Sequence, residues 1–294
     1  MKNKLMTRLF QFLSLILFIS CKDTVDKTTS VQADNSNQII KLYSKTVKDT
    51  FTVFVNLPDS FNLKPNAKYP VVYILDANLH FDIFKTIIKK YNEIEELPKM
   101  VLVGIGYANM NSNGKRFRDY CYPGGIVPFL DSLELGNGAD KFYSFIANEL
   151  SPLIDKNYQT DTTKRILFGH SLGGYFSSYA LLKSLESKNE FNSFISASPS
   201  LFLFDKYLPN QFSQNIFPKR QSKLKLYISS EGNEPKDSLA EAVHHFEILK
   251  SFAENVMSKD SDKVAVKYEM LQNIQHLDTP FPSFINGLRW ALNK

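Results

Sequence analysis

The sequence has few cysteines and no clustered metal ligands. Only two cysteines, Cys21 and Cys121, occur among the 294 residues, and two cysteines cannot build a framework of several disulfides. None of the five histidines combines with a cysteine at the spacing that zinc sites use. We therefore expect no metal site, and no residue pattern implies a cofactor.

The excess of positive charge is also small. The formal net charge is +5, and Lys2, Lys4 and Arg8 near the N-terminus supply part of it. The basic runs with interleaved aromatic residues that nucleic-acid-binding proteins use are missing, so we expect no nucleic-acid partner. The chain is 43% hydrophobic and 22% charged, which is ordinary for a globular protein that has a substantial core.

The N-terminal apolar stretch is too short to span a bilayer permanently. It comprises residues 9–20, LFQFLSLILFIS, and it follows the positively charged stretch MKNKLMTR. This order is typical of a secretory signal, so we expect residues 1–20 to be removed. The small residue before Cys21 resembles a bacterial lipoprotein box. This predicts lipidation of Cys21 and a membrane anchor in the cell envelope; the alternative is simple secretion or a periplasmic location.

Residues 21–37 are polar and lack an apolar period, which predicts a flexible tether. One folded domain is expected over residues 38–294. Within it, Cys121 lies between two tyrosines, and we interpret it as a partly buried, unreactive thiol.

Continuous apolar runs alternate with helical patterns along this domain. Strands that are buried on both faces are expected at residues 69–76, 100–107, 165–169, 194–198, 223–230 and 263–271. Helices are expected at residues 140–158, 171–185, 239–256 and 281–292. Residues 38–44 and 49–58 alternate in polarity and predict an antiparallel pair, whereas residues 129–140 are read as a loop. The alternation predicts an α/β fold with a mostly parallel central sheet covered by helices on both faces.

The stretch FGHSLGGYFSSYALL, residues 168–182, encloses one serine between glycines. Gly169, Ser171 and Gly173 fit Gly-x-Ser-x-Gly, with a strand before the serine and a helix after it. On such a turn the serine backbone is strained, and side chains at the glycine positions would clash. The helix N-terminus then directs free N–H groups at a developing oxyanion. We predict that Ser171 is a nucleophile; the alternative is a small-residue packing turn.

A serine nucleophile needs a base, and His276 is the favoured candidate. It lies in NIQHLDTP, directly after the last expected strand and before the last helix. We expect the loop at the carboxyl end of the last strand to return over the nucleophile. Among the other histidines, His170 is expected to point away from Ser171, and His244 and His245 to be surface or packing residues in the middle of a helix.

The orienting acid is expected between the nucleophile and the base, after the fifth buried strand. We favour Glu234, which follows a turn begun by Gly232; Glu231, Asp237 or no acid at all are the alternatives. The oxyanion hole is expected to use the backbone N–H of Leu172 and a second N–H from Asn78 or a neighbour in DANLH.

These residues together resemble the putative-esterase family of the α/β-hydrolases. The resemblance covers about residues 40–292 and is carried by VVYILDANLHFD, VGIGY, RFRDYCYP, FIANELSPLIDKNYQTD, RILFGHSLGGYFSSYALL and SASPSLF. The family includes esterase D, enterochelin esterases, feruloyl esterase modules and mycolyl transferases. The resemblance implies an α/β-hydrolase fold, with Ser171 as nucleophile and His276 as base.

It also implies that Arg118 and Asp119 have a structural role on the substrate side and that residues 198–200 lie near the mouth of the site. The chain departs from the family pattern at LDAN, where many members have LDG, and at IQHLDTP, which lacks a preceding glycine. The acid is the least fixed element of the family, and some enterochelin esterase relatives work with a Ser–His dyad.

We therefore expect a serine carboxylesterase with a small-molecule or glycan ester as substrate. Acylated or feruloylated carbohydrate is the first expectation, and a catecholate siderophore of the enterochelin type is the alternative. A second alternative is a non-catalytic lipoprotein with this fold that binds a glycan or a partner protein. A binding module has no need of a strained nucleophile turn, so the sequence favours the enzyme.

Overall fold

Hydrophobic strands that are buried on both faces build the centre of the protein. The computed structural model describes residues 31–33, 37–59, 61, 66–108, 113–127, 133–186, 190–232 and 239–293. The strands are β1 (Val31–Ala33), β2 (Asn37–Ser44), β3 (Asp49–Asn56), β4 (Tyr69–Ile74), β5 (Val101–Tyr107), β6 (Gly125–Val127), β7 (Leu133–Leu135), β8 (Thr160–His170), β9 (Ser193–Ala197), β10 (Leu224–Glu231) and β11 (Val264–Leu271). Every residue of β4 and β5 is buried, as expected for strands covered on both sides.

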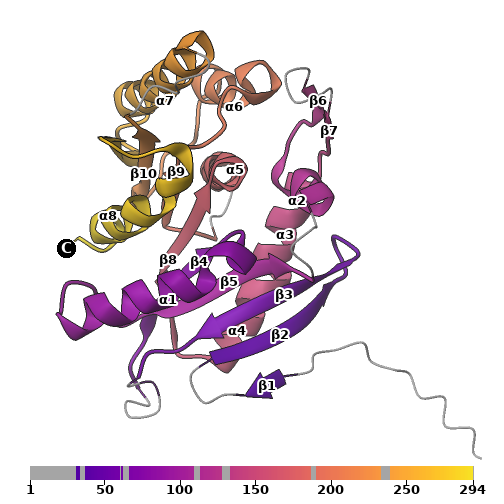
Figure 1. Cartoon of the computed structure of the whole chain (residues 1–294), viewed down its shortest axis with the longest axis vertical. Coiled ribbons are helices and arrows are strands. Elements are labelled where there is room, and N and C mark those ends of the chain that lie inside the picture. Colours follow the sequence, from indigo (N-terminus) through magenta and orange to yellow (C-terminus); the bar gives the residue numbers. More distant parts are fainter. Residues whose placement is uncertain are drawn as a thin grey trace, which may run out of the picture.

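The main sheet has nine strands in the order β1-β2-β3-β5-β4-β8-β9-β10-β11 (Figure 1). The strands β1, β2 and β3 pair antiparallel, and β3 also pairs antiparallel with β5. From β5 to β11 each neighbouring pair is parallel. This arrangement confirms the expected mostly parallel sheet with antiparallel N-terminal strands. The carboxyl ends of β8, β9, β10 and β11 therefore lie in a row along one edge.

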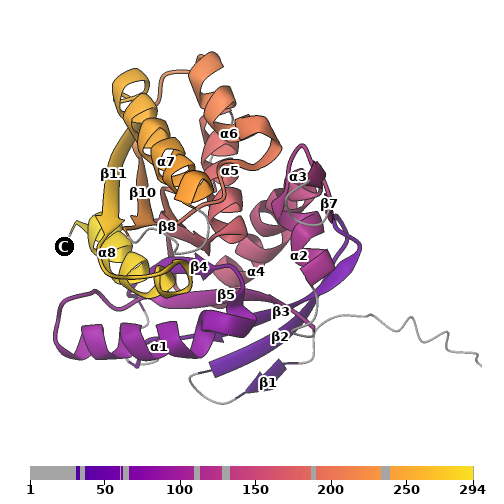
Figure 2. The ribbon, with the colours of Figure 1, turned by 45° about the horizontal axis from the view of Figure 1, so that its top comes forward.

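Helices cover both faces of this sheet. They are α1 (Ala77–Glu93), α2 (Asn113–Tyr120), α3 (Ala139–Phe145), the π-helical turn η2 (Ile146–Leu150), α4 (Ser151–Asn157), α5 (Leu172–Glu186), α6 (Leu203–Gln214), α7 (Leu239–Lys259), the short 3₁₀ turn η3 (His276–Asp278) and α8 (Pro280–Leu292). The helices α1 and α8 pack together on one face, while α2 to α7 lie on the opposite face (Figure 2).

The alternation of side chains along each strand divides the core into two layers. In β4 and just beyond it, Val72 and Ile74 point toward α1 and α8, whereas Tyr73 and Leu75 point the other way. On the α1 side, Phe84 of α1 stacks on Phe284 of α8 with ring centroids 3.9 Å apart. This contact joins the two helices that cover this face.

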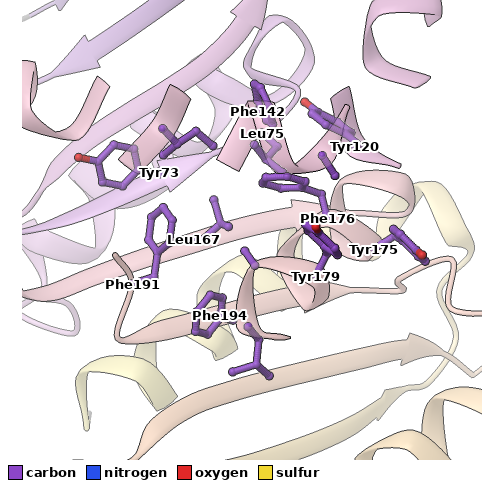
Figure 3. Packing of buried hydrophobic residues seen from close by; sticks show 14 of the residues in the cluster. Tyr73, Leu75, Tyr120, Phe142, Leu167, Tyr175, Phe176, Tyr179, Phe191 and Phe194 are labelled. Atoms are coloured by element: carbon purple, nitrogen blue, oxygen red, sulfur yellow. The ribbon is translucent and has the colours of Figure 1, made fainter. Parts of the chain in front are cut away.

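The opposite layer is rich in aromatic side chains. Figure 3 shows Tyr120, Phe142 and Phe176 close together. The Phe142 centroid lies 5.5 Å from that of Tyr120 and 5.0 Å from that of Phe176. Such tilted and edge-to-face contacts suit the aromatic quadrupole. They attach α2 and α3 to α5, the helix that follows Ser171.

Three helices and one hairpin were not expected from the sequence. The helix α1 has an apolar stripe, Ala77, Phe81, Phe84 and Ile88, whose spacing is a readable helical signal. The helices α2 and α6 are short or interrupted and carry little such signal. Strand β7 falls within the expected loop at 129–140 and pairs with β6 through Gly125 and Leu135. Among the described helices, none is long and apolar enough to cross a bilayer.

Candidate active site

Ser171 occupies a strained turn between β8 and α5. Its φ angle is 56°, a left-handed value that is uncommon for a residue with a side chain. A Cβ atom on Gly169 would lie 2.0 Å from the carbonyl oxygen of Gly173, and one on Gly174 would lie 3.0 Å from that of Ala197. The glycines are therefore required because the helix packs directly against the strands. The structure has the turn geometry that the sequence predicted.

The backbone of this turn is held by the neighbouring strand. The Ser171 N–H donates to the Ala197 carbonyl at 2.9 Å, and the Ser200 N–H donates to the Ser171 carbonyl at 3.2 Å. The Ser171 hydroxyl lies 3.5 Å from the Ser200 hydroxyl, and no described hydrogen bond joins it to His276. Contacts between a nucleophile and its base are often long without substrate and tighten in the complex.

Leu172, whose N–H the sequence predicts as the first oxyanion donor, is the first residue of α5. The first N–H groups of a helix have no partner within the helix, and the helix dipole favours negative charge at this end. The second expected donor, Asn78, lies in the first turn of α1. Its side chain donates to the Tyr107 carbonyl at 3.0 Å and accepts from the Tyr107 N–H at 2.7 Å. That side chain joins α1 to β5, and an oxyanion role for the N–H of Asn78 stays a prediction.

His276 begins η3, the turn between β11 and α8. This turn is stabilised by a capping box, in which the side chains of Gln275 and Asp278 bond each other's backbone. The His276 Nδ1 atom lies 3.1 Å from Oε1 of Glu231. Because the side chain is 40% exposed, the rest of the imidazole is accessible to a substrate. The structure thus places His276 against a carboxylate, as a base in this role requires.

The carboxylate at His276 belongs to Glu231, which corrects the preference for Glu234. Strand β10 stays in register with β11 through the pair Glu231 and Leu271, and the Gly232 N–H donates to the Leu271 carbonyl at 2.7 Å. The strand therefore ends one residue later than expected, and Glu231 is its last residue. Its side chain faces the site with a residue exposure of 8%. Glu234 and Asp237 lie outside the described residues.

The environment of Glu231 keeps its carboxyl ionised. Burial by itself would raise the pKa of this group. Hydrogen bonds with His276 and Ser198 outweigh burial, together with the attraction of the imidazole, and lower the pKa to about 2. An ionised carboxylate accepts a hydrogen bond from Nδ1–H and leaves Nε2 of the same ring available as a base.

Two further residues belong to this cluster: Ser198, which the resemblance placed only near the mouth of the site, and His245. The Ser198 hydroxyl donates to Oε2 of Glu231 and lies 3.1 Å from Nδ1 of His276. His245 on α7, which the sequence suggested to be a surface or packing residue, has its Nε2 atom 3.4 Å from the Ser198 hydroxyl. The sequence around His245 gives no indication of its contact with Ser198, because only the folded chain brings this part of α7 close to the end of β9. His244 has no described side chain.

His170 supports the loop that carries His276. Its Nε2 atom donates to the His276 carbonyl at 2.9 Å, and the two rings lie 4.6 Å apart. Burial, together with the neighbouring His276, lowers the pKa of His170 to about 3. His170 therefore stays neutral and holds the loop by its hydrogen bond.

A buried ion pair supports the other side of the turn. Asp76 follows β4 and accepts two hydrogen bonds from Arg116 of α2, at 2.8 and 3.1 Å. Tyr120 donates to the same carboxylate at 3.2 Å. A second guanidinium, that of Arg118, bonds Asp119 from 2.6 Å, and burial raises the pKa of Asp119 despite this partner. These pairs position α2 beside the Ser171 turn, and the substrate-side role that the resemblance implied for Arg118 and Asp119 stays a prediction.

Within the described residues, neither Cys121 nor a cluster of possible metal-binding side chains adds a further reactive group to the site. Cys121 is fully buried, and burial raises the pKa of its thiol to about 12, so it is a thiol rather than a thiolate at neutral pH. No group of three histidine, cysteine or acidic side chains is placed to hold a metal in the described parts of the chain. Cys21 lies outside the described residues.

Comparisons with known proteins agree with this geometry. A family model described as "Putative esterase" matches residues 44–259. The chain is 31% identical over 173 residues to the ferri-bacillibactin esterase BesA of Bacillus subtilis (strain 168), a match covering 56% of this chain and 58% of the relative. It is 29% identical over 143 residues to an apo-salmochelin esterase of Escherichia coli O6:H1, covering 47% and 43%. The matched region is thus about half the length of these curated relatives.

A solved structure extends the similarity over most of the chain. The BES protein from Bacillus cereus superposes with a TM-score of 0.71 at 24% identity, covering 88% of this chain and 96% of that chain. At this level of identity the comparison shows a shared fold, and it confirms the expected α/β-hydrolase type.

Proposed function

Because the chain belongs to the putative esterase family, we propose that it is a serine esterase whose nucleophile is Ser171. The observation that carries this proposal is the row of side chains along one edge of the sheet. Ser171 follows β8, Ser198 follows β9, Glu231 ends β10, and His276 follows β11. Ligand sites of open parallel sheets lie at this edge, and the strained serine and paired imidazole are the parts that acyl transfer needs.

The reaction proceeds in two steps. His276 accepts the proton of the Ser171 hydroxyl at Nε2 while the serine oxygen bonds the ester carbonyl carbon. The N–H of Leu172 stabilises the oxyanion of the tetrahedral intermediate. His276 then returns the proton to the leaving alcohol, and a water molecule hydrolyses the acyl-enzyme by the same route. Glu231 stabilises the imidazolium that forms in each step.

For the substrate we propose a catecholate siderophore, whose ester bonds the enzyme would cleave. The curated relatives are named for ferri-bacillibactin and apo-salmochelin, which favours the siderophore over the acylated or feruloylated carbohydrate that the sequence placed first. The ordered Glu231–His276 pair and the strained Ser171 argue against the binding-only alternative, since glycan or protein binding requires neither.

A hydrolysis screen tests this substrate class. Purified protein is incubated with ferric enterobactin, methyl ferulate and acetyl-xylan, and products are followed by liquid chromatography and mass spectrometry, with Ser171→Ala as the control. We expect the siderophore to have the highest kcat/KM and to yield linear fragments. Hydrolysis of methyl ferulate or acetyl-xylan alone would contradict the siderophore and leave the esterase mechanism standing.

For its location we propose a lipid anchor at Cys21 in the cell envelope. The charged and apolar residues 1–20 and the small residue before Cys21 support it. All of these residues lie outside the described part of the chain, so the support comes from sequence.

A further inference from the structure

Ser198 is a buried serine with a strained backbone at the centre of the site. It follows β9 directly, is 0% exposed, and has a φ angle of 40°. Its N–H donates to the Ser229 carbonyl at 2.9 Å, which holds the backbone in place. Strained residues cost free energy and are concentrated at functional sites, where the surrounding structure enforces them. The strained and buried position of Ser198 therefore indicates that the contacts of its hydroxyl group matter for the site.

The hydroxyl of Ser198 contacts three titratable side chains from three different elements. It donates to Oε2 of Glu231, and its oxygen lies 3.1 Å from Nδ1 of His276 and 3.4 Å from Nε2 of His245. A hydroxyl has one proton and two lone pairs. Because ionised Glu231 can only accept, the single proton is directed to the carboxylate. The two lone pairs then face the histidines, which must act as donors.

His245 fits the role of such a donor. Burial lowers the pKa of its imidazole to about 4, even though Glu231 attracts the charged form, so the ring is neutral at physiological pH. Among the described residues its Nδ1 atom is buried without a hydrogen-bond partner. A neutral imidazole carries one N–H, and the nitrogen with the polar neighbour is Nε2. His245 thus directs its N–H at Ser198 and competes neither for the Ser198 proton nor for the carboxylate.

The Ser198 hydroxyl oxygen is also a second acceptor for the N–H at Nδ1 of His276. His276 Nδ1 lies 3.1 Å from Oε1 of Glu231 and 3.1 Å from the Ser198 oxygen. Two acceptors on one side of the ring favour the tautomer that carries its proton on Nδ1. They also restrict rotation of the ring. The lone pair of Nε2 is then available toward Ser171.

We propose that Ser198 is a positioning residue of this site, bonding Glu231 and His276 at once so that the base keeps one tautomer and one orientation. The effect of Ser198 on the reaction rate rests on the proposed esterase function. Its effect on the hydrogen bonding of the His276 Nδ1 proton does not. The sequence suggested only that residues 198–200 lie near the mouth of the site.

Three variants of the full chain test this proposal. Ser198→Ala keeps the Cβ atom and removes only the hydroxyl, whereas Ser198→Gly removes the hydroxyl and relieves the strained φ angle. The matched control is Ser196→Ala, which removes another fully buried hydroxyl on β9 that bonds Ser178 at 3.1 Å. We expect kcat for p-nitrophenyl acetate to fall roughly 10- to 100-fold in both Ser198 variants, with KM changed less than about twofold, as for loss of a bond to a charged group.

The low-field proton resonance of His276 Nδ1–H gives a readout that a merely structural role would not move. We expect it to shift in Ser198→Ala and Ser198→Gly and to stay unchanged in Ser196→Ala. An unchanged resonance in the Ser198 variants would overturn the proposal, and so would a wild-type kcat. If Gly restored the activity that Ala lost, backbone strain rather than the hydroxyl would be responsible, which also overturns it. If the wild-type protein hydrolysed no ester, the proposed function would fail, while the resonance would still decide the role of Ser198.

Discussion

Oε1 of Glu231 lies 3.1 Å from Nδ1 of His276, and the register of two parallel strands sets this distance. Glu231 is paired with Leu271, the last residue of β11, after which the chain turns into the loop that carries His276. The acid and the base therefore approach each other because the strands β10 and β11 end together. Movement of β10 by one residue would turn the carboxylate to the other face of the sheet.

Glu231→Gln should lower kcat strongly with little change in KM. The amide keeps the shape of the side chain but removes the charge that stabilises the imidazolium, and loss of the acid in a full triad costs about 10⁴ in kcat. Steady-state hydrolysis of p-nitrophenyl acetate measures the effect. Glu234→Gln is the matched control and should stay within roughly threefold of wild type. A larger loss in Glu234→Gln than in Glu231→Gln would reverse the assignment of the acid.

The Glu231 carboxylate should also make stability depend on pH. Its pKa is lowered from 4.5 to about 2 in the folded protein, so its contribution is fully present above pH 4.5 and is lost as the pH falls toward 2. We expect the difference in unfolding free energy between wild type and Glu231→Gln to be largest near neutral pH and to shrink between pH 4.5 and 2. Urea unfolding at a series of pH values measures it. A difference that stays constant over this range would contradict the lowered pKa.

Arg116→Met should destabilise the fold. The Asp76 side chain is 8% exposed and the Arg116 side chain 23% exposed, and removing one partner of a buried pair costs about 3 kcal/mol because the other charge is left unpaired. Denaturant unfolding of the variant measures the loss. The exposed pair Lys90 and Glu93 is the control, since Lys90→Met should change stability by less than about 1 kcal/mol. Equal effects of the two changes would show that Asp76 does not depend on Arg116.

Cys21→Ser should move the protein from the membrane fraction to the soluble envelope fraction or the medium, with esterase activity retained. A multiply acylated cysteine anchors firmly, whereas a protein without the chains loses that anchor. Fractionation of cells that express each form, followed by immunoblotting, measures the distribution. Equal membrane association of wild type and variant would argue against lipidation.

The order of elements and the position of Ser171 could be predicted because local patterns encode them. Apolar runs mark strands that are buried on both faces, and the glycines around Ser171 are needed for contacts within one turn and its neighbouring strand. His276 could be placed because it follows the last expected strand. Helix α1 also had a readable period, in which Phe81, Phe84 and Ile88 share one face.

The surroundings of the base could not be predicted in the same way. The choice between Glu231 and Glu234 depends on whether β10 ends one residue earlier or later, and strand ends are set by pairing with a distant strand rather than by local sequence. Ser198 and His245 lie 47 residues apart in the chain, and only the packing of α7 against β10 and β11 brings them together. Their sequence context is that of a short loop and an ordinary helix.

Covalent labelling by a fluorophosphonate tests the central claim most directly. A serine activated by His276 and Glu231 attacks the phosphorus and displaces fluoride, so the adduct marks the nucleophile. Digestion and tandem mass spectrometry of the labelled wild-type protein should place the adduct on Ser171, and Ser171→Ala should remain unlabelled and lose hydrolysis by at least roughly 10³-fold with an unchanged thermal midpoint. An adduct on another serine, or full hydrolysis by Ser171→Ala, would contradict the account.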